Sequence, residues 1–185
     1  MRKNFGVKPY LYPMPVLILA AYDGEGVPCC MNAAWGGICS DDRIAMCVSP
    51  GHKTVKNILE KGEFTVSVGS AEYETACDYV GIESGNQVPD KFERAGFHAE
   101  KSEFVDAPLI SELKMALDCK LYSYDEESHL MIGTIVNVNA DESILTGGEI
   151  DPSKIKPITY DPVNHKYIVL GEIVGDAFGD GEKLK

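Results

Sequence analysis

Two long strand-like segments joined by a very short link constrain the fold of this chain most strongly. Residues 112–124 and 129–140 are rich in β-branched, aromatic and other apolar side chains, and only the polar link over residues 125–128 separates them. A link of four polar residues is short enough for a tight turn, so the two segments are predicted to pair as an antiparallel hairpin.

Shorter candidate strands and helices surround this hairpin. Strands are expected over residues 16–22, 27–35, 43–48, 64–68 and 166–170, and helices over 54–61, 70–79 and 89–95, with a glycine close behind each helix. The turn Asp23-Gly24-Glu25-Gly26 joins the first two strands as a hairpin. Alternation in residues 64–68 indicates a half-buried strand, and residues 151–162 look like a proline-rich connector.

These segments predict a mainly β protein with helical insertions, an antiparallel barrel formed by a single domain over residues 1–185. No G-x-G-x-x-G sequence follows a strand, which argues against a doubly wound dinucleotide-binding sheet. The tail over residues 175–185 is rich in glycine and charge, and it is expected to pack peripherally or on a partner subunit.

Charge and composition exclude several classes of function. The net charge of −12 argues against nucleic-acid binding, which needs an extended basic surface. The longest apolar run, residues 16–22, is too short to span a membrane, and the first nine residues are too polar for a secretory signal. The protein is therefore expected to be soluble and cytoplasmic, without a membrane partner.

The six cysteines include no C-x-x-C pair and the histidines show no ligand spacing, so no metal site is predicted. Cys47 and Cys119 lie in apolar strand-like runs and are expected to be small buried side chains. The adjacent pair Cys29-Cys30 could be redox-active, although neighbouring thiols rarely form an unstrained disulfide.

A polar turn between a strand and a helix forms a candidate anion site. The turn runs from Ser49 to Thr54, where free N–H groups, the helix dipole and Lys53 would all favour a phosphate. Residues 43–61 contain four basic residues and one acidic residue in an otherwise acidic chain. The alternative is that these lysines only solvate an exposed helix face.

A second candidate ligand segment, residues 31–37, mixes small side chains with the only tryptophan of the chain, Trp35. Small side chains and the Gly36-Gly37 pair would let a flat ligand lie close to the backbone. Trp35 could form a wall of this site, or it could be an ordinary tryptophan of the barrel core.

Several motifs in a fixed order resemble those of one known family across nearly the whole chain. They lie at residues 12–16, 23–24, 32–35, 49–54, 57–58, 62–68, 90–92 and 117–119, at His129 with Gly133, and at residues 171–178. Together they resemble the flavin reductase-like family, specifically its flavoredoxin branch, which is built on the FMN-binding split barrel with a Greek-key-like antiparallel arrangement.

The resemblance implies FMN as the cofactor and assigns residues to it. The flavin phosphate would be held by Ser49, Pro50, His52, Lys53 and Thr54, which coincide with the anion site found from the residues alone. The flavin ring would lie along Asn32, Ala33, Ala34 and Trp35, while Lys91 and Phe92 would border the flavin. The family also implies a homodimer with the flavin near the subunit interface.

The nicotinamide side of the site is less well matched. Many members of the wider family carry Gly-Asp-His before the second long hairpin strand, and that histidine is linked to nicotinamide binding. The corresponding run here is Glu127-Ser128-His129, so His129 is the candidate catalytic residue on this side. The alternative is that His129 simply ends the hairpin loop.

The resemblance implies an NAD(P)H:flavin oxidoreductase that passes electrons from NAD(P)H through bound FMN to a flavin or protein acceptor. The flavin would supply the redox chemistry, which agrees with the lack of a Ser/His/Asp or Cys/His arrangement in the sequence. One alternative is a flavoredoxin-type electron carrier that serves redox protein partners without using NAD(P)H. A third interpretation is a split-barrel protein that binds no flavin.

Overall fold

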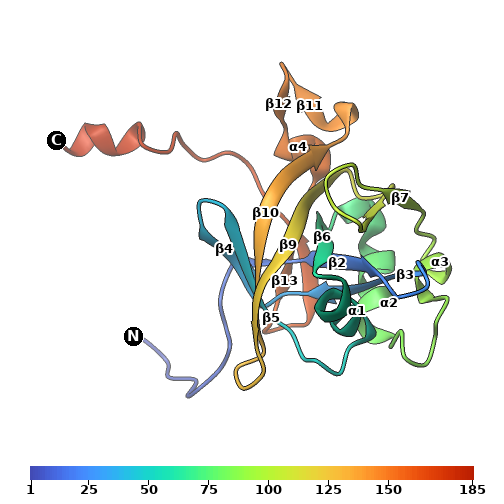
Figure 1. Cartoon of the computed structure of the whole chain (residues 1–185). Helices are drawn as coiled ribbons and strands as arrows, with labels where there is room; N and C mark the ends of the chain where they lie inside the picture. The colour runs from blue at the N-terminus through green and yellow to red at the C-terminus, as the bar shows by residue number, and fades with distance from the viewer.

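A computed structural model describes the whole chain, residues 1–185, and its body is a curled antiparallel sheet (Figure 1). Seven strands follow the order β3-β2-β6-β9-β10-β5-β4. These strands are β2 (Leu17–Tyr22), β3 (Pro28–Ala33), β4 (Gly36–Ser40), β5 (Arg43–Cys47), β6 (Glu63–Val68), β9 (Met115–Asp125) and β10 (Leu130–Ala140). The predicted mainly β, antiparallel barrel-like fold is confirmed.

The long β9–β10 hairpin forms as predicted and runs through the middle of the sheet. Its register extends from Leu130 opposite Asp125 to Ala140 opposite Met115, with two irregularities on the way. Such irregularities bend a strand and strengthen its twist, which helps the sheet to curl. Gly133 allows a close approach here, because an added Cβ would lie 2.5 Å from the ring of the buried Phe64.

Strand β2 is buried on both faces, which explains its continuous apolar run. Leu17, Leu19 and Ala21 belong to a core beneath helix α1 (Lys53–Lys61), whereas Ile18 and Ala20 belong to a second core. That second core lies beneath α2 (Glu74–Ile82) and includes Phe92 of α3 (Lys91–Arg94). The sheet therefore carries a core on each side at this end.

Strand β6 differs from its prediction as a half-buried strand. Thr65 and Ser67, the expected solvent-facing residues, are fully buried. The Thr65 hydroxyl donates to the Pro108 carbonyl at 2.6 Å, since the segment around β7 (Ala99–Lys101) and β8 (Pro108–Ile110) covers this face. The buried Thr65 hydroxyl thus has an acceptor, whereas the buried Ser67 hydroxyl has no hydrogen-bond partner.

The prediction that residues 151–162 form an irregular connector is wrong, because this segment contains a helical turn, α4 (Pro152–Ile155), and a strand, β13 (Ile158–Asp161). β13 pairs with β1 (Met14–Pro15) and β14 (Lys166–Val169) in a three-stranded sheet. The remaining elements are η1 (Ala71–Tyr73), η2 (Glu142–Ile144), β11 (Leu145–Thr146), β12 (Glu149–Ile150) and η3 (Asp180–Leu184). None of the helices combines the length and apolar character needed to cross a membrane.

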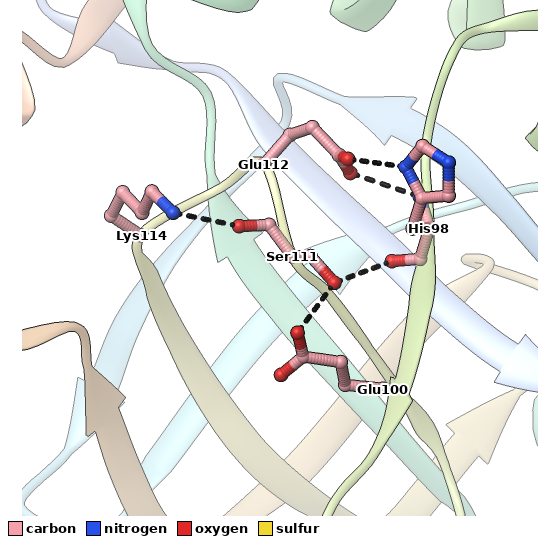
Figure 2. Close-up of polar contacts among 5 residues, drawn as sticks. All are labelled: His98, Glu100, Ser111, Glu112 and Lys114. Carbon is pink, nitrogen blue, oxygen red and sulfur yellow. Dashed lines mark hydrogen bonds and ion pairs between the residues drawn. The ribbon is translucent and has the colours of Figure 1, made fainter.

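A cluster of polar side chains fastens the β7–β8 segment to the start of β9 (Figure 2). Glu112 accepts from the His98 backbone N–H at 2.9 Å and lies 2.6 Å from its ring Nδ1. The Ser111 hydroxyl donates to the His98 carbonyl and to Glu100, and Lys114 Nζ donates to the Ser111 carbonyl at 3.1 Å. These contacts stabilise the hairpin formed by β7 and β8.

Both ends of the chain extend away from the sheet (Figure 1). Residues 1–13 and 168–185 are exposed throughout. Beyond Leu170, whose N–H donates to the Pro157 carbonyl at 3.3 Å, the hydrogen bonds of the tail are all internal to it. The expectation that this tail packs on a partner subunit stays a prediction.

Candidate functional site

Helix α1 begins with unpaired hydrogen-bond donors. The turn before it is closed by the His52 N–H donating to the Ser49 carbonyl at 3.3 Å, and no side chain caps the helix. The N–H groups of Lys53, Thr54 and Val55 have no acceptor in the structure. These free donors and the positive end of the helix dipole suit an anion, so the turn and helix start form the candidate site that the sequence predicts.

The helix start opens into a polar cavity of about 260 Å³. Nine of the twelve predicted site residues line it: Asn32, Ala33, Ala34, Trp35, Ser49, His52, Lys53, Thr54 and Lys91. The cavity thus brings the segment after β3 together with the start of α1 and with α3. Its other lining residues are Met31, Cys47, Val48, Val80, Gly81, Glu83, Ser84 and Gly85.

Three predicted site residues do not line this cavity. Phe92 is almost fully buried in the second core, where its ring packs edge-on against Phe97 at 5.9 Å. Pro50 lies in the turn but outside the lining. His129 is the last residue of the hairpin turn before β10, and its carbonyl accepts from the Val48 N–H at 2.9 Å. His129 has φ +58° in this turn, and its assignment to the nicotinamide side stays a prediction.

Lys53 reaches the cavity rim and forms an ion pair there. Its Nζ lies 3.3 Å from Asp23 Oδ2, in the hairpin between β2 and β3. The backbone N–H of Val27 does most to lower the pKa of Asp23, and Glu25 and Lys53 lower it further. Asp23 is therefore ionised at neutral pH, and its negative charge partly neutralises the positive charge of Lys53.

Lys91 is a buried cation without an anion. Only 3% of the residue is exposed, and Nζ donates to the carbonyls of Val80 at 3.0 Å and Glu83 at 2.9 Å. No carboxylate lies within 4.0 Å of this ammonium group. Buried charges are normally paired, so an uncompensated ammonium in a cavity wall fits a site built for an anionic ligand.

His52 adds a neutral ring to the same wall. Burial lowers the pKa of His52, and the nearby Lys91 charge lowers it further. The imidazole is therefore neutral at pH 7, so it presents one donor and one acceptor nitrogen. The other basic residues predicted for this region lie elsewhere: Arg43 stacks on Tyr122, and Lys56 bonds to Asn86.

The loop after α2 closes the polar end of the cavity, and sequence reasoning missed it. The Asn86 side-chain amide donates to the Gly51 carbonyl at 3.0 Å, which ties this loop to the anion-site turn. An added Cβ at Gly85 would lie 2.7 Å from Cys29 Sγ and 3.2 Å from Lys53 Cβ. The glycine in a polar loop was the available signal, because it marks a close backbone approach.

An apolar groove of about 550 Å³ continues from the polar cavity. The two share Ala34, Trp35 and Cys47, and together they form one trough with a polar and an apolar end. Trp35 is 53% exposed, so the alternative of a barrel-core tryptophan is wrong. Cys47 is exposed as well, contrary to the prediction that it is buried, because its side chain faces this trough.

The trough fits a ligand with an anionic end and a flat apolar end. Free N–H groups and a buried ammonium serve the anionic end, whereas small side chains beside Trp35 leave room for a planar ring. No group of His, Cys, Asp or Glu residues in the structure has an arrangement that could hold a metal ion.

Comparison with known proteins agrees with this geometry. The sequence profile of the flavin reductase like domain matches residues 10–161. The chain belongs to the flavin reductase-like family. Its fold superposes on the flavoredoxin of Desulfovibrio vulgaris (Miyazaki F) with a TM-score of 0.93 and 37% sequence identity, covering 98% of this chain and 100% of that chain.

Two further solved structures of the family are similar. The flavoredoxin from Methanosarcina acetivorans gives a TM-score of 0.87 at 26% identity, covering 100% of this chain and 98% of that one. Nitrilotriacetate monooxygenase component B from Bacillus cereus gives 0.76 at 25% identity, covering 89% and 88%. The two flavoredoxins therefore cover 98% and 100% of this chain.

Proposed function

We propose that this protein is an FMN-binding flavoprotein that passes electrons from NAD(P)H through bound FMN to a flavin or protein acceptor. The observation that carries the proposal is the trough, in which unpaired helix N–H groups and the buried Lys91 ammonium adjoin an apolar groove. Bound flavin supplies hydride and single-electron transfer chemistry. The chain itself binds, orients and shields the cofactor.

The residues divide this work between the two ends of the trough. At the polar end, Lys53 and Thr54 offer backbone N–H groups, and the Ser49 hydroxyl can donate to the same phosphate. At the apolar end, the small side chains of Ala33 and Ala34 let the ring approach the backbone. FMN rather than FAD is supported by the similarity to the flavoredoxin branch of the family.

The family resemblance supports a homodimer as the functional form of the protein. It also supports NAD(P)H as the electron donor. No residue of the trough is placed as a proton donor or acceptor for hydride transfer, and none is required for it. The second candidate is an electron carrier that exchanges electrons with redox proteins and does not use NAD(P)H. The 37% identity to a flavoredoxin over 98% of the chain supports this alternative.

An anaerobic absorbance experiment tests the proposal and separates the two candidates. FMN-loaded protein is titrated with NADH and then with NADPH, and the absorbance band of oxidised flavin in the blue region of the visible spectrum is followed. Prompt bleaching by either nucleotide is the expected result. A band that persists until dithionite is added would favour the electron carrier. Protein that takes up no FMN would overturn both.

The phosphate assignment is tested by Lys53→Glu. A second carboxylate beside Asp23 would repel a phosphate at the helix start, so we expect at least a roughly 10-fold loss of FMN affinity with the fold retained. Quenching of the single tryptophan, Trp35, by added FMN gives the dissociation constant. Lys61→Glu, at the other end of α1, is the matched control and should bind FMN normally. Normal binding by Lys53→Glu would refute the assignment.

A further inference from the structure

A further pocket of about 210 Å³ adjoins the polar cavity. Its opposite wall is formed by Asp78 of α2, Tyr160 of β13 and Tyr167 of β14. Four residues line both the pocket and the polar cavity: Asn32, Ala34, Trp35 and Gly81. We call this site the aromatic pocket, because Trp35, Tyr160 and Tyr167 all contribute aromatic rings to it.

The aromatic rings of this pocket provide surfaces that favour a cation. The rings of Tyr160 and Tyr167 have centroids 6.2 Å apart and planes inclined at 55°, so they form two walls that meet at an angle. The half-exposed ring of Trp35 adds a third aromatic surface. The faces of aromatic rings carry partial negative charge, so a positively charged group gains energy when several rings surround it.

Asp78 adds a full negative charge to the aromatic pocket. Its Oδ1 accepts from the Tyr167 hydroxyl at 2.8 Å, and no lysine, arginine or histidine nitrogen lies within 4.0 Å of the carboxylate. Burial, the hydrogen bond to Asp78 and the nearby charge of Glu74 raise the pKa of Tyr167. The lining contains no basic residue, so nothing in the pocket compensates the negative charge.

We propose that the aromatic pocket binds an organic cation with an alkylated ammonium group, and that Asp78 provides the compensating negative charge. Alkyl groups weaken the hydration of an ammonium ion, so this cation loses little on leaving water and gains contact with the aromatic rings. A neutral group of the same shape would leave Asp78 uncompensated. A metal ion fits less well, because no His, Cys, Asp or Glu cluster in the structure could hold one.

The position of the pocket couples this cation to the cofactor, and this consequence rests on the proposed function. Ala34 and Trp35 line the aromatic pocket as well as both ends of the trough. A cation in the pocket would therefore lie beside a flavin placed along residues 32–35 and would stabilise the negative charge that the flavin gains on reduction. We expect the reduced, FMN-loaded protein to bind the cation about 5-fold more tightly than the oxidised form.

A comparison of choline with its neutral isostere 3,3-dimethyl-1-butanol tests the proposal on flavin-free natural protein. Both are titrated into ¹⁵N-labelled protein at about 0.15 M salt, which screens non-specific attraction to the acidic surface. Trp35 is the only tryptophan, so its indole N–H gives one NMR signal that reports on the pocket. Choline should bind at least about 10-fold more tightly than the alcohol. Equal affinities, or no shift of the signal by choline, would overturn the proposal.

Two variants test the residues assigned to the cation. Asp78→Asn removes the charge but keeps an oxygen that can accept from Tyr167, so choline should bind about 10-fold more weakly while the alcohol binds as before. Tyr160→Leu removes one aromatic wall and should weaken choline binding about 5-fold. Glu103→Gln, an exposed carboxylate outside the pocket lining, is the matched control and should bind choline normally. Normal choline binding by Asp78→Asn would contradict the role of its charge.

A peptide that carries trimethyl-lysine offers the same group from a protein source. Tighter binding of the peptide than of choline would assign the cation to a partner protein, and tighter binding of choline would assign it to a small molecule. Either result requires the pocket to recognise the alkylated ammonium group, and an unmethylated peptide that binds equally well would refute this recognition.

Repeating the choline titration with FMN-loaded protein separates this inference from the proposed function. Choline binding to both the flavin-free and the FMN-loaded protein supports a cation site beside the cofactor. Loss of choline binding when FMN is present would show that the flavin itself fills the pocket, and equal affinities in the oxidised and dithionite-reduced forms would contradict the coupling. Protein that takes up no FMN would refute the proposed function, while the flavin-free titrations would still decide whether the cation binds.

Discussion

Two lysines reach the polar cavity, and their surroundings give them different properties. Lys53 is at the rim, with Asp23 as a counter-ion, so binding an anion there must compete with an existing ion pair. Lys91 is buried and bonded only to carbonyl oxygens. Because low polarity strengthens electrostatic interactions, Lys91 should attract an anionic ligand more strongly than the partly neutralised Lys53.

Lys91→Met should therefore reduce both stability and FMN binding. The change leaves the carbonyls of Val80 and Glu83 without their charged donor, which we expect to cost about 2 kcal/mol of unfolding free energy. Urea unfolding of the flavin-free protein measures this loss, and Trp35 fluorescence measures the affinity for FMN. Lys53→Met is the control, since Lys53 is more exposed and should change stability much less. Equal unfolding midpoints for the two variants would contradict this account.

Glu112 carries a pH-dependent contribution to stability in the cluster of Figure 2. Burial by itself would raise the pKa of Glu112, but hydrogen bonds from the ring and backbone N–H of His98 outweigh it and lower the pKa below the ordinary 4.5. A carboxylate whose folded pKa is lowered stabilises the protein above its unfolded pKa. That stabilisation is lost as the pH falls through the folded value.

Glu112→Gln should therefore cost about 1 kcal/mol of unfolding free energy at pH 6–7, and the cost should shrink below about pH 4. Urea unfolding across this pH range checks the expectation. Glu103→Gln, an exposed residue of the same segment without a polar contact in the structure, should show no such difference at any pH. A cost that stays constant down to pH 3 would mean that the carboxylate charge is not responsible.

At the scale of elements, the sequence predicts the strands and helices that are determined by their own residue pattern and by the turns next to them. The apolar run of β2 and the four-residue link of β9–β10 each determine an element without reference to the rest of the chain. Strand β4 was missed because Gly36 and Gly37 carry no side-chain pattern; an added Cβ at Gly36 would clash with Met46 at 2.7 Å. β13 was missed because it depends on pairing with β1, some 145 residues earlier in the chain.

In the candidate site, too, the parts set by neighbouring residues were predicted and the parts set by tertiary contacts were not. The turn and start of α1 were predicted, because a strand, a polar turn and a helix N-terminus follow one another directly. The ion pair between Lys53 and Asp23 and the buried state of Lys91 arise from tertiary contacts, so no local pattern predicts them. The family resemblance placed both Lys91 and Phe92 beside the flavin, but successive helical side chains point in different directions, and Phe92 points into the second core.

The loop after α2 should set how well the polar end closes. Gly85→Ala adds a methyl group that meets Cys29 and Lys53, so the loop must move away from the helix start. Overpacking of this kind costs roughly 1–3 kcal/mol, and we expect about a 10-fold loss of FMN affinity by tryptophan quenching. Gly181→Ala, where an added Cβ meets nothing within 4 Å, is the matched control. Unchanged affinity in Gly85→Ala would show that the loop does not close on the ligand.

At the scale of the whole molecule, the charge distribution separates cofactor binding from encounter with partners. The chain carries a net charge of −12, yet the polar end of the trough presents unpaired N–H groups and Lys91. A small anion can therefore bind inside an acidic surface, because desolvated local donors outweigh charges that solvent screens. The outer surface instead attracts cations and basic proteins over a longer range.

Electron transfer from the reduced, FMN-loaded protein should therefore depend on both salt and the charge of the acceptor. With a small basic haem protein as the acceptor, the bimolecular rate should fall about 10-fold as ionic strength rises from about 0.02 to 0.5 M, since salt screens the attraction. Ferricyanide, an anionic acceptor, should react faster as salt is added, because repulsion is screened. Anaerobic stopped-flow absorbance measures both rates. If the two acceptors showed the same salt dependence, the acidic surface would have no part in selecting partners, and contact chemistry at the trough would have to provide that selection.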